Sequence, residues 1–533
     1  MSSRTRSILW RASVAGFLAL ALWPIWAHRF PPMQDYPQHL FHSHLLAAQG
    51  DPRYDYDRYY ELHLQPVYAL FYVLTAGFAK VVPIEAAGKL TLSLYPLLVA
   101  VLVLRLRRRL PEDAPPWGAL LLFPLAPNQQ WFFGNVNFFL SVPLLFLALL
   151  DFEDLLAKGS SARAILRQAA WQAALFVTHP LTFLAFVAIA VFVTFARRRK
   201  VERAWRRLAG PLAVSAVLLG GLLLQSMLSR APPVPADPRV GWIPPWMSLE
   251  YVGLMFTGMR PPSMGVLLDV LPWAGIAAIV VACAWSQRRS APGTGAPADY
   301  LWLLAILFAA TLFLPFSKGV FSFINVRIAS ILYALLALVA ARVRVRGLAA
   351  ALLVALAAVC TLRSDAKQAR ISAETEEIVG IFDGLPQRAK ILPLVFDNTS
   401  PELDPTWFHP HLLDATYYHV VVGGGFDPYL IRSPIHPVHF REGARRPAPG
   451  EFWAGAFDWK AHGADYDYFL VRGAPDGFAR VMDLRATRIG ASGRWELYKR
   501  RPTQAYGDHV TRPVCVALNV ALDGQPPSTI GSR

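Results

Sequence analysis

Long apolar segments are the feature that most constrains this chain. Of its 533 residues 54% are hydrophobic, and many runs are nearly free of charge and long enough to cross a lipid bilayer as a helix. A soluble domain would instead alternate apolar and polar residues along each element. The sequence therefore predicts an α-helical polytopic membrane protein.

The first apolar run extends from Ile8 to Ala27, with Arg4 and Arg6 before it and Arg11 in its first turn. It is longer than the apolar core of a typical signal peptide, which has about 7–15 residues. We therefore expect an uncleaved first helix, whose start these arginines hold in the cytoplasm.

Clusters of Lys and Arg set the predicted topology, because cytoplasmic loops carry the excess of these residues. The clusters lie at residues 105–109, 163–167, 197–207, 288–289 and 342–346. All of them are cytoplasmic if residues 67–82, a short apolar segment, lie at the outer interface and do not cross the membrane. About eleven transmembrane helices then follow, with the C-terminus outside. The expected spans are 8–27, 86–104, 117–133, 135–150, 165–178, 180–196, 208–228, 266–286, 300–316, 325–341 and 347–362.

Three regions then face outward: residues 28–85 with interfacial helices, residues 229–265, and the tail. Two helix pairs, 117–150 and 164–196, have about 34 residues each, whereas two full spans need about 40. Their outer turns therefore end below the membrane surface, where polar backbone is tolerated only inside protein or beside a wet cavity. Polar residues in these turns either face such a cavity or cap helix ends and bond each other. They are Asn128, Gln129, Gln130, Asn135, Asn137 and His179.

The composition changes after Ser364, where Gly, Pro and charged residues become frequent. Residues 373–385 have helical periodicity, and "KILPLVF", "YYHVVVGG", "DYDYFLVRG" and "GRWELYKRR" have the pattern of short strands. We expect a transmembrane domain over residues 1–362, an extracytoplasmic mixed α/β domain over 365–503, and a flexible tail over 504–533.

Charge and cysteines add little to this prediction. The formal net charge of +16 follows from the loop clusters and does not by itself indicate a nucleic-acid partner. The three cysteines, Cys283, Cys360 and Cys515, form no CxxC pair. Neither a metal cluster nor a disulfide framework is expected, although a Cys360–Cys515 bridge stays open.

The stretch "FPPMQDYPQHLFHSHLL" directly follows the first helix. Pro37 suits the first turn of a helix, which places Asp35 near its N-cap. Asp35 is thus either a helix cap or a carboxylate held at the membrane surface for chemistry. We interpret His39, His42 and His44 as interfacial side chains with a polar tip, because no companion carboxylates indicate a metal site.

The layout of the chain resembles that of the GT-C glycosyltransferases. The shared features are a first helix, an Asp shortly beyond it, interfacial helices in the first external loop, a multispan body and an external C-terminal domain. The protein O-mannosyltransferases and the enzymes that add aminoarabinose to lipid A have this layout. The segment "QDYPQHL" is similar to the "DYPxH" start of a group of bacterial members. The resemblance covers residues 1–362. It departs where several GT-C families carry an acidic pair, since Tyr36 follows Asp35 here.

The resemblance implies a sugar donor on a polyprenyl phosphate, an envelope glycan, lipid or protein as acceptor, and a bacterial inner-membrane location. In one inverting displacement, Asp35 would accept the proton of the acceptor hydroxyl. The leaving lipid phosphate needs cations near the outer leaflet. The candidates for phosphate contacts are Arg327, Lys318, Arg260 and His179. Further candidates for substrate contacts are His39, Gln129, Asn135 and Asn137. No cofactor is expected, and dependence on a divalent cation stays open.

Other functional classes remain open at this point. A lipid or glycan transporter would also have many spans, but the hydropathy shows no inverted repeat and the spans hold few carboxylates. A non-catalytic membrane protein of envelope assembly would tolerate replacement of Asp35. An O-antigen ligase-like transferase would need a key Arg and His in a late external loop, and residues 229–265 contain no His. The sequence names neither the sugar nor the acceptor.

Overall fold

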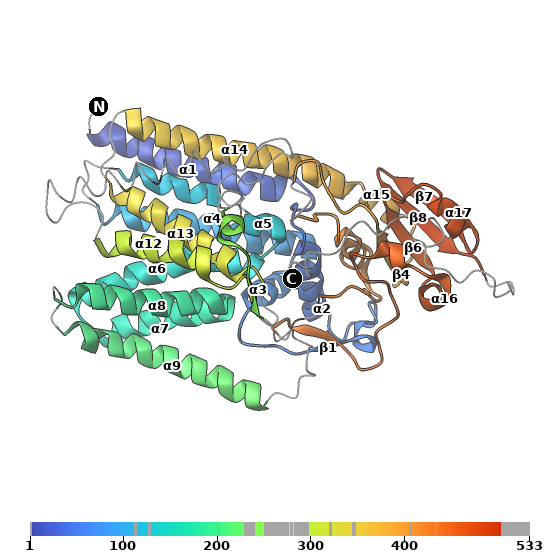
Figure 1. The fold of residues 1–533 in the computed structure, drawn as a ribbon, viewed down its shortest axis with the longest axis horizontal. Coiled ribbons are helices and arrows are strands. Elements are labelled where there is room, and N and C mark those ends of the chain that lie inside the picture. The colour runs from blue at the N-terminus through green and yellow to red at the C-terminus, as the bar shows by residue number, and fades with distance from the viewer. Residues whose placement is uncertain are drawn as a thin grey trace.

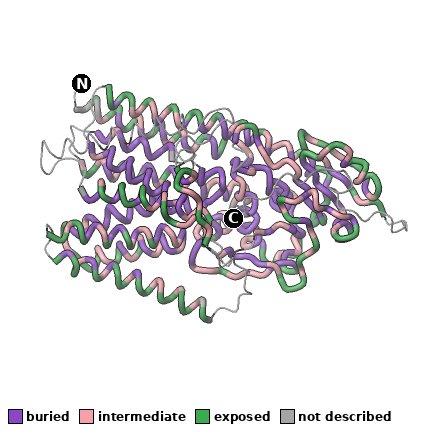
Figure 2. Tube along the Cα trace, viewed as in Figure 1, coloured by how far each residue is buried: buried purple, intermediate pink, exposed green. Residues whose placement is uncertain are grey.

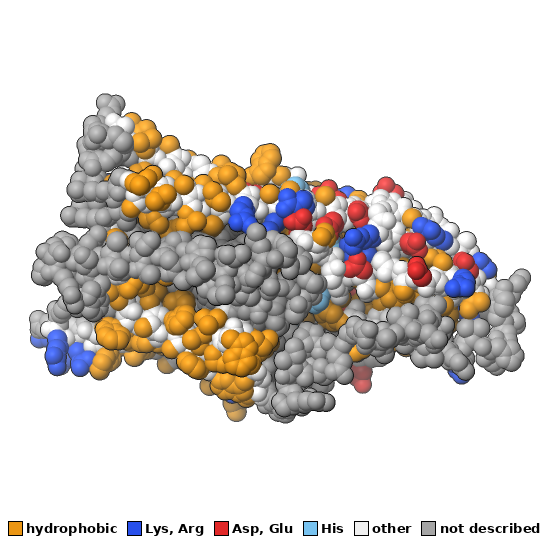
Figure 3. Space-filling model, turned by 45° about the horizontal axis from the view of Figure 1, so that its top comes forward, with side chains coloured by type: hydrophobic (Ala, Val, Ile, Leu, Met, Phe, Trp, Pro, Cys, Tyr) orange, Lys and Arg blue, Asp and Glu red, His pale blue; other side chains and the backbone are white. Residues whose placement is uncertain are grey.

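The computed structural model shows a helical bundle joined to a smaller part that contains most of the strands (Figure 1). It describes residues 3–502 except 111–114, 126–128, 200, 202, 229–239, 250–276, 278–280, 282–297, 319–321, 344–347, 404–407, 432 and 434. Hydrophobic side chains gather over the bundle, and charged side chains of both signs gather over the strand-containing part (Figure 3). Such a division is typical of a protein with one part in a membrane and another part in water.

Long helices make up the bundle. They are α1 (Ser3–Ala27), α4 (Ile84–Arg107), α6 (Val136–Lys158), α7 (Ala162–Thr178), α8 (Pro180–Arg197), α9 (Ala204–Leu228), α12 (Ala298–Phe313), α13 (Ile324–Arg342) and α14 (Leu348–Glu376). Among the described residues, six helices (α1, α4, α8, α9, α13 and α14) are long and apolar enough to cross a membrane. The most apolar window of α13 is 89% buried and that of α9 only 17%, so α13 is central and α9 peripheral (Figure 2).

The structure confirms a helical fold with six candidate membrane-spanning helices among the described residues, whereas the predicted count of about eleven spans is not confirmed. The predicted span 117–133 is not one helix. It consists of a 3-10 segment, η2 (Trp117–Leu125), and the five-residue helix α5 (Gln129–Phe133). Pro124 lies within η2 and has no N–H to donate, which disfavours a continuous α-helix. The predicted span 266–286 lies almost wholly outside the described residues.

The first external segment contains two short helices at the end of the bundle that faces the strand-containing part (Figure 1). They are α2 (Tyr36–Ala47) and α3 (Leu70–Phe78). The nine residues of α3 are too few to cross a bilayer, as expected for residues 67–82.

Helix α14 links the two parts of the molecule. α1 and α14 both end at the strand-containing part (Figure 1). There the backbone N–H of Arg29 donates to the Glu376 carboxylate at 2.7 Å, and the Ser372 hydroxyl donates to the Phe30 carbonyl at 3.1 Å. Because α14 continues to Glu376, the predicted domain boundary at residue 365 lies inside a helix.

At the opposite end of the bundle, Glu153 of α6 pairs with arginines from other parts of the chain. Its carboxylate pairs with Arg109 at 3.1 Å, Arg197 at 2.9 Å and Arg342 at 2.9 Å, and it accepts from the Tyr300 hydroxyl at 2.8 Å. A buried charge is tolerated when it is paired in this way. The arginines that predicted the topology therefore also hold the helices together.

The strand-containing part is built on a four-stranded sheet in the order β4-β6-β8-β7. The strands are β4 (Ile391–Val395), β6 (Tyr468–Arg472), β7 (Ala486–Ser492) and β8 (Trp495–Arg500). β4 pairs with β6 in parallel, and the other pairs are antiparallel. Three predicted strands are confirmed as β4, β6 and β8. The predicted strand "YYHVVVGG" is wrong: it contains a π-helical turn, η4 (His419–Gly423), whose His419 ring stacks on Phe41 of α2.

The first external segment and the C-terminal region form one body. Strand β1 (Tyr60–Leu62) pairs antiparallel with β5 (Val438–Phe440). In α2, the Gln38 amide donates to Thr416 Oγ1 and to Asp427 Oδ2, both at 2.8 Å. These partners are 378 and 389 residues away along the chain.

A buried histidine fixes the end of α14 to the strand-containing part. His411 Nδ1 lies 2.8 Å from Asp414 Oδ2, and its Nε2 lies 2.9 Å from Glu374 Oε2 in α14. Burial disfavours a charged imidazole, but the Asp414 and Glu374 carboxylates outweigh burial and raise the pKa of His411.

Gly118 in η2 has no room for a side chain, since a Cβ would lie 2.4 Å from the Ala340 carbonyl carbon in α13. We expect Gly118→Ala to lower the free energy of unfolding by roughly 1–3 kcal/mol, because central backbone must move. Gly16→Ala in α1, where nothing lies within 4 Å, is the control and should be neutral or slightly stabilising. Thermal unfolding in one detergent measures both variants. Equal Tm values would contradict the close packing of η2 on α13.

Candidate functional site

The segment that carries Asp35 lies directly against the end of α5. The backbone N–H groups of Gln34 and Asp35 donate to the carbonyls of Phe132 and Phe133 at 2.8 and 3.1 Å. Gly134 follows with φ +81°, and a Cβ there would lie 2.8 Å from the Asp35 nitrogen. Glycine meets both requirements, because it adopts positive φ and lets the two backbones approach. The contact fixes the backbone of Asp35 relative to the bundle.

The Asp35 side chain does not cap α2. Its φ and ψ are −92° and −6°, and its carboxylate makes no capping hydrogen bond. The capping interpretation of this residue is therefore not supported. The neighbouring Tyr36 is only 1% exposed, whereas Asp35 keeps part of its surface accessible. A carboxylate that neither caps a helix nor is fully enclosed is available to a ligand.

The environment of Asp35 disfavours its charged form. Burial and, second, the negative charge of Glu451 raise the pKa of Asp35 to about 7, against a hydrogen bond from Gln34 and the positive charge of Arg327. The carboxyl is thus set deep among protein atoms although solvent still reaches it. A carboxyl group with a pKa near neutrality is well matched to general-base chemistry.

Arg327, near the start of α13, is the cation of this site. Its Nη2 donates to Asn135 Oδ1 at 2.9 Å, and its guanidinium lies 5.7 Å from the Phe138 ring centroid. Asn135 Nδ2 donates in turn to Gln130 Oε1 at 2.8 Å. The Nε of Arg327 has no hydrogen-bond partner among the described residues. The guanidinium is therefore positioned by an amide and keeps one donor for a ligand.

His179 lies beside Arg327 as a neutral side chain. It is the N-cap of α8, where its Nδ1 accepts from the Leu181 N–H at 3.2 Å. Its ring contacts Tyr68 and Phe138, with centroids 5.4 and 5.2 Å away. Burial and then the charge of Arg327 hold the pKa of His179 well below its usual value. His179 can accept or donate a hydrogen bond, but it supplies no positive charge to a phosphate.

The other amides of the two outer turns have different environments. Asn137 Nδ2 donates to the Tyr68 carbonyl at 2.9 Å, and its Oδ1 accepts from the Phe71 N–H at 2.9 Å. Asn137 therefore holds the start of α3. Gln129 is fully buried, and neither amide atom has a hydrogen-bond partner among the described residues.

The histidines of α2 are buried, which corrects their interpretation as interfacial side chains. His39 Nδ1 lies 2.7 Å from the Tyr72 hydroxyl, and His39 and His42 pack edge-to-face on His436, with centroids 6.0 and 5.1 Å away. Burial and, second, His436 lower the pKa of His39 to about 3. His44 bonds the Tyr56 hydroxyl at 3.0 Å. Among the described residues no group of three or more His, Cys, Asp or Glu side chains is arranged to hold a metal ion.

The structure brings four of the predicted site residues together: Asp35, Arg327, Asn135 and His179. Lys318 lies in the short strand β3 (Ser317–Lys318), paired with β2 (Val240–Gly241), and its side chain is exposed. Arg260 lies outside the described residues.

Residues of the C-terminal region were missed by the sequence analysis. Glu451 acts on Asp35 through its charge. The His409 N–H donates to Gln34 Oε1 at 3.0 Å, and Phe408 stacks on Phe133 with centroids 4.8 Å apart. No signal in the sequence links residues so far apart. The site is therefore closed on one side by the strand-containing part.

The sequence matches no family model, and a search of curated proteins finds no relative. Function is therefore inferred from the residues and their geometry alone.

Gly134→Ala tests whether the backbone contact at Asp35 stabilises the protein. The substitution adds strain at positive φ and also places a Cβ 2.8 Å from the Asp35 nitrogen. Gly50→Ala is the matched control, because Gly50 has φ +75° and nothing within 4 Å of the added Cβ. Thermal unfolding should show Gly134→Ala to be less stable than Gly50→Ala by roughly 1–3 kcal/mol. If the two variants lose equal stability, the Asp35 backbone does not depend on this contact.

Proposed function

We propose that the chain is an integral membrane glycosyltransferase of the GT-C type. It moves a sugar from a polyprenyl-phosphate donor to an envelope acceptor at the outer face of the membrane. The observation that carries the proposal is the Asp35 carboxyl group, which caps no helix, keeps solvent access and interacts electrostatically with Arg327. The membrane is the bacterial inner membrane, with the N-terminus in the cytoplasm and the strand-containing part outside.

The proposed reaction is a single inverting displacement. The acceptor oxygen attacks the anomeric carbon of the donor sugar while its proton passes to Asp35. The bond between the anomeric carbon and the phosphate oxygen breaks, and its electron pair leaves on the lipid phosphate. A carboxylate whose pKa is raised to about 7 is a stronger base than an ordinary Asp.

The leaving phosphate gains negative charge in the transition state, and a fixed cation there stabilises that state more than the bound substrate. Arg327 fits this role, because an amide positions its guanidinium and its Nε has no partner among the described residues. Lys318 and Arg260 remain further candidates, and His179, Gln129 and Asn135 are candidates for hydrogen bonds to the sugar or phosphate.

The charge of Glu451 supports the assignment of Asp35 as the base. Several GT-C families have two adjacent acidic residues, whereas Tyr36 follows Asp35 here. Glu451 brings a second negative charge to Asp35 from the C-terminal region and so favours proton uptake by Asp35. Glu451 is thus the second acidic residue of the proposed site.

We expect Asp35→Asn to bind donor and to lose about 10²–10⁴-fold in turnover, because the amide cannot take the acceptor proton. The wild-type rate should rise with pH through about 7, where Asp35 ionises, and level off above it. The measurement is release of polyprenyl phosphate from a panel of labelled polyprenyl-phosphate sugars, with envelope extract as the source of acceptor.

Asp57→Asn is the matched control, since Asp57 is an exposed carboxylate in the same external segment. Arg327→Ala should lower turnover by about 10²–10³-fold, and Arg327→Lys should recover part of it. If Asp35→Asn turns over donor as fast as wild type, Asp35 is not the base. If wild type turns over no donor in the panel, the transporter and assembly functions gain support.

A further inference from the structure

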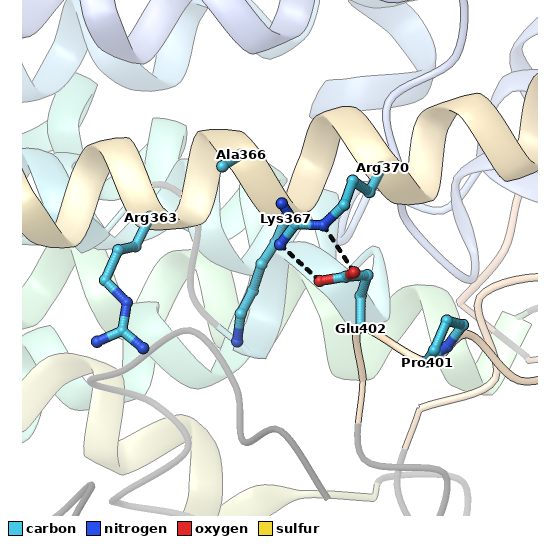
Figure 4. A pocket seen from close by; sticks show the side chains of 6 residues that line it. All are labelled: Arg363, Ala366, Lys367, Arg370, Pro401 and Glu402. Atoms are coloured by element: carbon cyan, nitrogen blue, oxygen red, sulfur yellow. Dashed lines mark hydrogen bonds and ion pairs between the residues drawn. The ribbon is translucent and has the colours of Figure 1, made fainter.

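A second candidate site lies on α14, outside the region around Asp35. A pocket of about 240 Å³ is lined by Arg363, Ala366, Lys367, Arg370, Pro401 and Glu402. Figure 4 shows the Arg363 and Lys367 side chains extending from α14 toward the same side. None of the lining residues belongs to the site proposed for sugar transfer, so an inference about this pocket does not depend on that function.

The position of the pocket along α14 places it at the level of lipid headgroups. Leu348, Leu352 and Val359 are large exposed apolar side chains on this helix. Arg363 follows Val359 by four residues and Arg370 follows Arg363 by seven, spacings that continue the same helical face. The exposed face of α14 thus changes from apolar to basic within one turn. Such a change marks the boundary between the hydrocarbon and headgroup layers of a membrane.

The charge of the pocket is positive. It contains three basic side chains and one carboxylate, Glu402, which pairs with Arg370 at 2.6 Å. Arg363 is exposed, whereas Lys367 is only 8% exposed and so is built into the wall. Guanidinium and ammonium groups one helical turn apart can grip two oxygens of one phosphate group.

The pocket and the Asp35 site are lined by different residues. Pro401 and Glu402 line the pocket. Further along the same segment, Phe408 stacks on Phe133 and the His409 N–H donates to Gln34, beside Asp35. A ligand lined by the pocket residues therefore need not enter the Asp35 site.

We propose that the α14 pocket binds a phosphate group. The group is carried by a lipid headgroup at the outer membrane surface or by a soluble phosphate ester. Arg363 and Lys367 contact its oxygens, while Ala366 and Pro401 provide apolar surface for the carbons next to the phosphate. Arg370 is restrained by Glu402 and contributes less.

The test uses the full-length protein in detergent micelles and three probes. Phosphatidylglycerol offers phosphate on a lipid, diacylglycerol has the same chains without phosphate, and glycerol 3-phosphate has the headgroup without chains. Binding is measured by the saturable rise in Tm and by lipid retained in native mass spectrometry. We expect phosphatidylglycerol to bind, diacylglycerol not to bind, and Arg363→Gln/Lys367→Gln to bind at least about tenfold more weakly. Glycerol 3-phosphate that binds equally well identifies a soluble phosphate ester as the ligand.

Charge-matched controls separate this site from general attraction to a basic protein. Lys460→Gln/Arg480→Gln removes two exposed positive charges from the strand-containing part and should leave binding unchanged. Arg363→Lys/Lys367→Arg keeps the charge and should retain most binding even if the Gln variant folds poorly. Glu402→Gln releases Arg370 and should strengthen binding. The proposal is overturned if Arg363→Gln/Lys367→Gln binds like wild type, or if diacylglycerol binds as well as phosphatidylglycerol.

Discussion

The backbone contact between Gln34–Asp35 and Phe132–Phe133 positions the rest of the site. Its two hydrogen bonds are each worth only about 0.5–1.5 kcal/mol. They matter because they fix where residues 34–35 lie along residues 132–134. A side chain in place of Gly134 would displace Asp35. Asn135 follows one residue later and binds Arg327. A single turn of chain therefore holds the carboxylate and the guanidinium in one frame, although 292 residues separate them in sequence.

The arginines at the two ends of the bundle are used differently. Arg197 and Arg342 at the far end each face the Glu153 carboxylate in direct ion pairs, which compensate the cost of burying charge. Arg327 has an amide as its hydrogen-bonded partner and feels the Asp35 charge only through space. A charge held in place without a contacting counterion favours the arrival of an anion. This difference distinguishes an arginine that stabilises the fold from one suited to a ligand.

The sequence predicted the parts of the fold that depend on local pattern. Apolar runs located α1, α4, α8, α9 and α13, because a candidate span is recognised by the length and hydrophobicity of one local segment. Local pattern failed where packing decides. The valines of η4 have high strand propensity, yet η4 packs on α2 as a helical turn. At the site, the position of Asp35 shortly after the first helix marked it as a candidate residue. Glu451 and His409 were not predicted as site residues, because only the folded chain brings them near residues 34–35.

The C-terminal region is part of the site and not an appended domain. Gln38 of α2 bonds Thr416 and Asp427, and β1 pairs with β5, so the first external segment is folded against this region. The packing buries the α2 histidines and keeps His39 neutral, so that the positive charge acting on Asp35 among the described residues is that of Arg327. The same packing brings Glu451 to Asp35 and raises its pKa. The basicity of Asp35 is thus a property of two regions joined together, because neither the bundle nor the sheet alone supplies both the enclosure and the second carboxylate.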